Sequence, residues 1–155
     1  MKNLFIISLI AIFIQSCSTP YKGSGFRGGY SETQLDENVF KVSFRGNGYT
    51  GRERVSAFTL LRCAELALEN GYKYFVIIDA NSYTSNSIYT TPTTFNTTGY
   101  GQGNSTTTTA GGQTYIISKP SSSNTIVCFK EKPESGFSYN AGIIYKNISL
   151  KYDIK

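Results

Sequence analysis

The 155-residue chain contains no histidine and no tryptophan, and the first absence limits the chemistry that it can perform. Histidine is the side chain whose ordinary pKa lies closest to neutral pH, and it is the commonest metal ligand in proteins. The acidic residues are scattered and do not have the spacing of a calcium-binding loop. We therefore expect this protein to be no enzyme and to bind no metal ion or cofactor.

The chain also lacks an apolar run long enough to cross a bilayer as a helix, which takes about 20 residues. Residues 4–14 carry no charge and follow Lys2, as in the hydrophobic region of a signal peptide. The sequence Ile14-Gln15-Ser16-Cys17 then resembles a lipobox, although Gln15 replaces the usual small residue. We predict cleavage before Cys17 and lipidation of its thiol. The alternative is an ordinary cleaved signal peptide that leaves Cys17 free.

No cluster of positive charge is present either. The formal net charge is +5, and removal of residues 1–16 takes away only Lys2. Proteins that read nucleic acids usually concentrate basic residues on one face or helix, so we expect no nucleic-acid partner. Ser18, rather than Asp, follows the cysteine, which favours the periplasmic face of the outer membrane as the location.

After the predicted lipidation site, residues 17–37 are rich in Gly, Ser and Pro at their start and are expected to form a flexible tether. Residues 38–155 then form a single domain. Phe40, Val42 and Phe44 alternate with polar residues, which predicts a strand over residues 39–45 with one buried face.

A helix is predicted over residues 51–70. Thr50 and Glu53 have the spacing of a capping box at its start, and Gly71 fits a left-handed cap at its end. The expected core stripe consists of residues that fall on one arc of the helix: Ala57, Leu60, Leu61, Ala64, Ala67 and Leu68.

The second half is predicted to contain four short strands and a second helix. The strands are residues 72–79, 83–90, 114–118 and 124–130, the last two joined by a turn at residues 119–121, and the helix covers residues 138–151. This order indicates an α+β fold: a mixed, largely antiparallel sheet with two helices packed on one face, plus a long low-complexity loop.

Residues 80–118 carry no charge, and 17 of these 39 positions are Ser or Thr. So few apolar groups predict a mobile loop at about residues 91–112. An uncharged segment with several tyrosines can bind a glycan or a protein by stacking and hydrogen bonding. The alternative is a solvated linker that has no partner.

Two further cysteines, Cys63 and Cys128, would be the only thiols left after lipidation. In an oxidising compartment they could form a disulfide, and the alternative is that both are small packing residues. The acidic residues nearest the predicted core have ordinary explanations. We expect Glu53 to cap a helix, Glu65 and Glu69 to pair with Arg62 on the surface, and Asp79 to end a strand.

Four short motifs, Gly29-Tyr30-Ser31-Glu32, Phe40-x-Val42-x-Phe44-x-Gly46-Asn47, Leu60-Leu61-Arg62-x-Ala64-Glu65 and Gly71-Tyr72-x-Tyr74-Phe75, resemble a family of small, uncharacterised proteobacterial lipoproteins. Cys63 departs from that pattern, in which alanine is expected. The resemblance implies a location and a fold but no activity, so only the lipidated Cys17 carries over.

The sequence thus favours a membrane-anchored, non-enzymatic envelope protein with a structural or interaction role. The alternative is a periplasmic module that binds cell-wall glycan or a partner protein through residues 80–118.

Overall fold

The computed structural model describes residues 17–100, 104–134 and 136–154, so the predicted signal peptide lies outside it. Its elements in chain order are β1 (Gly29–Asp36), β2 (Val39–Arg45), α2 (Arg52–Glu69), β3 (Tyr74–Thr90), β4 (Thr94–Tyr100), β5 (Asn104–Ala110), β6 (Thr114–Phe129), β7 (Tyr139–Asn140) and α3 (Ala141–Tyr152). The predicted α+β fold class is confirmed.

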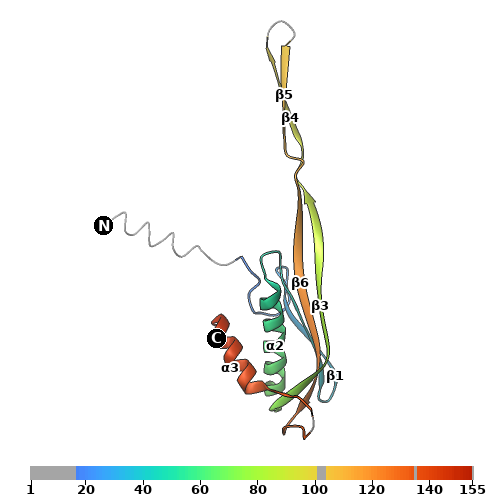
Figure 1. Cartoon of the computed structure of the whole chain (residues 1–155), viewed down its shortest axis with the longest axis vertical. Helices are drawn as coiled ribbons and strands as arrows, with labels where there is room; N and C mark the ends of the chain where they lie inside the picture. Colours follow the sequence, from blue (N-terminus) through green and yellow to red (C-terminus); the bar gives the residue numbers. More distant parts are fainter. Residues whose placement is uncertain (1–16, 101–103, 135, 155) are drawn as a thin grey trace, which may run out of the picture.

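One five-stranded sheet has the order β1-β2-β6-β3-β7, and its paired strands are antiparallel. Both helices lie on one side of it, α2 against the sheet and α3 alongside α2 (Figure 1). The alternation predicted for residues 39–45 is confirmed, because Phe40, Val42 and Phe44 are buried beneath α2. Ile126 of β6 and Phe75 of β3 complete this core layer.

Helix α2 agrees with the helix predicted over residues 51–70, but the predicted capping box at its start is absent. Gly51 occupies the N-cap without a side-chain hydrogen bond. The Thr50 hydroxyl instead donates to Asn47 Oδ1 at 2.8 Å, and Glu53 accepts from Lys151 Nζ at 2.6 Å. A partner in the preceding turn and a partner in α3 therefore replace the predicted capping box.

The core stripe of α2 is wider than the one predicted. Leu61, Ala64 and Ala67 are buried as expected, whereas Leu68 is 41% exposed. Additional residues fill the interface with the sheet and α3: Val55, Phe58, Thr59, Cys63 and Leu66. Helix α3 packs its end against this surface through an edge-to-face contact of Tyr152 with Phe58, with ring centroids 5.1 Å apart.

Strands β3 and β6 continue far beyond the sheet. Their pairing with the rest of the sheet ends near Arg45↔Ser121, but they pair with each other out to Thr90↔Thr114. Strands β4 and β5 then form a second ribbon at the outer end (Figure 1). We call residues 84–118 the arm, and the other described residues the body.

The structure corrects three predictions about this region. The strands predicted over residues 72–79 and 83–90 are one strand, and so are those over 114–118 and 124–130. Residues 119–121 form no turn, because Pro120 pairs with Thr84 and its carbonyl accepts from Gly46 N at 2.8 Å. The low-complexity loop predicted at residues 91–112 contains β4 and β5, since Thr and Tyr favour extended backbone even where little is buried.

A glycine pair joins the two ribbons of the arm. Gly111 and Gly112 both have positive φ angles, 97° and 72°, and a Cβ on Gly111 would lie 1.9 Å from the carbonyl oxygen of Pro92. Only glycine fits such a close approach in this conformation, so this pair fixes the bend between β5 and β6.

Candidate functional site

The residues that follow Cys17 are fastened to the body rather than forming the predicted tether. Cys17 itself is exposed, and its carbonyl accepts from Asn47 Nδ2 at 2.8 Å. Thr19 is buried, and its backbone N–H donates to Thr50 Oγ1 at 2.8 Å. The side chain of Arg54 in α2 donates to the Ser18 hydroxyl. The predicted lipidation site is therefore attached to the domain without a flexible spacer.

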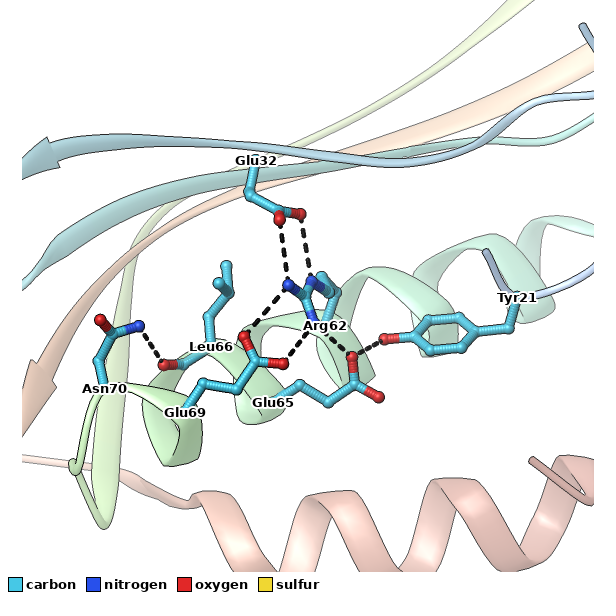
Figure 2. A network of polar contacts seen from close by, with 7 residues as sticks. All are labelled: Tyr21, Glu32, Arg62, Glu65, Leu66, Glu69 and Asn70. Carbon is cyan, nitrogen blue, oxygen red and sulfur yellow. Dashed lines mark hydrogen bonds and ion pairs between the residues drawn. The ribbon is translucent and has the colours of Figure 1, made fainter. Parts of the chain in front are cut away.

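A polar cluster fastens the same N-terminal segment further along (Figure 2). Arg62 of α2 donates to both carboxylate oxygens of Glu32 in β1, at 3.1 and 3.0 Å. It also donates to Glu65 at 2.8 Å and to Glu69 at 2.9 and 3.2 Å. The Tyr21 hydroxyl donates to the same Glu65 oxygen at 2.5 Å. Arg62 therefore joins α2 to β1 directly and to the segment of Tyr21 through Glu65.

The surroundings of Arg62 and Tyr21 in this cluster keep both side chains in their protonated forms. Burial alone would lower the pKa of the Arg62 guanidinium, but the hydrogen bonds that it donates to Glu32, Glu65 and Glu69 outweigh burial and raise it. Burial, followed by the hydrogen bond to Glu65, raises the pKa of the Tyr21 hydroxyl well above its usual value. Neither group exchanges a proton near neutral pH, so we assign the cluster a structural role.

The interpretation of Glu65 as an ordinary surface partner of Arg62 is corrected by this geometry, whereas Glu69 is 54% exposed and is a surface partner as predicted. The Arg62 side chain is 11% exposed and the Glu65 side chain 16%, and the Arg62 guanidinium also lies 4.7 Å from the centre of the Tyr30 ring. Removing one partner of such a shielded pair costs more than breaking an exposed pair on one helix, because it leaves an uncompensated charge away from water.

Cys63 and Cys128 lie in the same core cluster, and both are free thiols. Burial raises the pKa of each thiol to about 12. The reactive form of cysteine is the thiolate, so these side chains have the surroundings of packing residues rather than of nucleophiles.

The other two acidic residues singled out by the sequence, Glu53 and Asp79, each pair with a nearby side chain. Glu53 pairs with Lys151, and Asp79 accepts from Asn81 Nδ2 at 2.9 and 3.0 Å. Among the described residues, no three His, Cys, Asp or Glu side chains are grouped to hold a metal ion. A pocket of about 260 Å³ lies between the start of α2 and the base of the arm, and Arg52 is the charged residue in its lining.

The arm exposes large apolar side chains on both of its faces. In β3 and β6, Ile88 pairs with Ile116 on one face, and Tyr89 pairs with Tyr115 on the other. Ile88 is 74% exposed and Ile116 67%. Hydroxyl contacts between strands, such as Thr97 Oγ1 to Thr107 Oγ1 at 3.0 Å, join the outer ribbon.

Cys17 and the arm lie at the same end of the body. Cys17 is bonded to Asn47 in the connection between β2 and α2. This connection also contacts the base of the arm, because a Cβ added to Gly48 would lie 2.7 Å from the side chain of Ile117. Figure 1 shows the arm leaving the body beside the start of α2.

No family model, curated protein or solved structure matches this chain. The resemblance to small proteobacterial lipoproteins therefore stays a prediction. Within residues 17–100, 104–134 and 136–154, no helix is both long and apolar enough to span a membrane.

Proposed function

We propose that this protein is a lipid-anchored, non-enzymatic protein of the bacterial envelope, and that the arm is the part that contacts a partner. The observation that carries the proposal is that the exposed apolar side chains of the arm have no counterpart to bury them within the described residues. Exposed apolar groups gathered in one region are typical of interaction surfaces.

The attachment geometry supports the membrane part of this proposal. The lipobox-like sequence ends at Cys17, and Thr19 is already buried in the body. Lipid on Cys17 would hold the body directly at the membrane surface, within reach of anionic headgroups for its excess of basic residues.

A protein partner suits the arm better than a glycan does. Small-ligand sites are usually concave, whereas the arm is a narrow two-stranded ribbon (Figure 1). An extended ribbon offers unpaired backbone N–H and C=O groups along its edges, which bind another strand by β-augmentation.

The anchor is tested by intact-mass measurement of the membrane-fraction protein, compared with Cys17→Ser. A species that begins at residue 17 and carries the mass of diacylglycerol, absent from the variant, is the expected result. An unmodified species in the soluble fraction would refute the anchor.

The contact role is tested with a photoreactive amino acid placed at Ile116 or, as the matched control, at Leu35. Both side chains are apolar and exposed, at 67% and 56%, but Leu35 lies in the body near the end of β1. We expect protein adducts in intact cells from position 116 and few from position 35. Equal adducts from both positions, or none from position 116, would contradict the proposal.

A further inference from the structure

The outer edge of β3 is unusually long and open. Strand β7 pairs with β3 only at Tyr74 and Phe75. Along residues 76–90 the structure describes no strand on that side, while β6 occupies the other side. Every second residue of an open edge leaves both its backbone N–H and its C=O unpaired, which makes such an edge a template for another strand.

The two edge strands of the five-stranded sheet differ in how well they are protected against pairing with another strand. Strand β1, at the opposite edge, carries Glu32 and Asp36 and has an irregular register near its end. The N-terminal segment also covers part of it, since Tyr30 N donates to Lys22 O at 2.9 Å. Charges, irregular register and covering chain are the usual ways in which proteins block edge pairing. Strand β3 has one irregularity of its own, between Ile77 and Asp79, but residues 80–90 pair with β6 without a further shift and contain no charge and no proline.

We infer that the outer edge of β3 pairs antiparallel with the same edge of a second copy of this chain. This inference rests on the proposed role of the arm as the contact element and names the partner. Two identical edges meet around a two-fold axis, so any charged residue near the axis would face a like charge. A segment without charge removes that repulsion, and its Ser, Thr, Tyr and Ile residues suit the extended backbone.

A pairing centred on Ser85 agrees with the positions of the nearest charges on β3 and β6. Lys119 of β6 pairs with Ser85, but the two copies of Lys119 would lie three strand spacings apart, about 14 Å, which is beyond the distance at which salt screens exposed charges. The two Asp79 carboxylates would then lie at opposite ends of the paired segment, roughly 40 Å apart at the ordinary rise of a strand. Ser85 would lie opposite Ser85 of the second copy, and Tyr83 opposite Ser87. The two ribbons would form four adjacent strands, and three or more strands are what gives a sheet independent stability.

The two-fold axis also places both anchors on one side. An axis perpendicular to the sheet leaves both helix layers on the same side of the combined sheet. Ser18, next to Cys17, contacts Arg54 of α2, so both Cys17 residues lie on the helix side. A single membrane surface parallel to the combined sheet can therefore hold both lipids, and shared anchoring raises the effective concentration of the copies.

The test is disulfide cross-linking of the full chain in its own membrane. Single cysteines replace Ser82, Ser85 or Ser87 on β3, and Ser118→Cys on β6 is the matched control because it is an exposed serine on the other edge of the arm. Cys17 would be lipidated, and Cys63 and Cys128 are buried, so the new thiol is the accessible one. Directly opposed residues of antiparallel strands lie close enough for a disulfide.

We expect a disulfide-linked dimer from one β3 position, several-fold more abundant than from Ser118→Cys. Dimer yields that are equal on both edges, or no dimer from any β3 position, would overturn the inference. The photoreactive probe at Ile116 separates the two proposals: adducts to other proteins without a β3 disulfide would leave the contact role standing and remove self-pairing. The loss of both signals would refute both.

Discussion

The body and the arm contain the same two strands, yet different forces hold the two regions. In the body, β6 lies between β2 and β3 beneath α2, β7 borders the start of β3, and Phe75 and Ile126 are fully buried. In the arm, the same strands pair only with each other, and Ile88 and Ile116 face solvent. Forming a ribbon and stabilising a fold therefore have different requirements. β-Propensity and backbone pairing are enough to extend a ribbon, whereas the stability of the fold comes from buried side chains.

The largest expected effect comes from one substitution made in both regions of β6. Ile126→Ala removes a buried side chain and should lower the free energy of unfolding by about 3 kcal/mol. Ile116→Ala makes the same change on an exposed side chain and should alter it by less than about 0.5 kcal/mol. Urea denaturation of both variants measures the difference. Equal losses would show that the arm belongs to the folded core.

The next largest loss of stability is expected from a substitution in the polar cluster. Arg62→Met keeps the volume of the side chain but leaves Glu32, Glu65 and Glu69 without their cation. Removing one partner of a shielded ion pair costs about 3 kcal/mol, and we expect a loss of this size in urea denaturation. Limited proteolysis should also cut the variant faster between residues 18 and 28, because Tyr21 and Glu32 lose their link to α2. An unchanged unfolding midpoint would contradict the role assigned to the cluster.

Alkaline pH is expected to lower the free energy of unfolding by a smaller amount, through a thiol that lies in the body. The pKa of Cys63 is about 12 in the folded chain, above its ordinary value of 9.0. As pH rises, the Cys63 thiol therefore loses its proton in the unfolded chain before it does so in the folded chain. The contribution of the protonated thiol to the free energy of unfolding is complete below pH 9 and decreases as pH rises toward 12. At pH 10.5 the Cys63 thiol accounts for about 2 kcal/mol of the loss. Cys63→Ala should flatten the decline above pH 9, and an equally steep decline in that variant would contradict this origin.

The sequence predicted the body well where local patterns decide the structure. The alternation of Phe40, Val42 and Phe44 predicted β2, and helical spacing of apolar residues predicted α2 and α3. The spacing of Arg62, Glu65 and Glu69 on one helix was also visible. Glu32 and Tyr21 reach the same cluster from distant parts of the chain, and no local pattern encodes contacts across such separations.

The arm was predicted less well because low apolar content was taken as a sign of missing structure. Segments such as residues 106–109, four threonines in a row, cannot form a core. They can still form a ladder, since strand pairing satisfies the backbone without burying side chains. The flexible tether was mistaken for a similar reason: the glycines and serines of residues 18–31 suggested freedom, but Thr19 and Tyr21 dock onto the body.

We expect the body to fold without the arm, because the proposed role of the arm is contact alone. Replacing residues 86–118 by Asn-Gly tests it directly, because Ser85 and Lys119 are paired and Asn-Gly closes a two-residue hairpin. The free energy of unfolding of this variant should lie within about 0.5 kcal/mol of that of the complete chain, and the cross-links should be lost. A loss of several kcal/mol in the variant would contradict the claim and show that the arm stabilises the body.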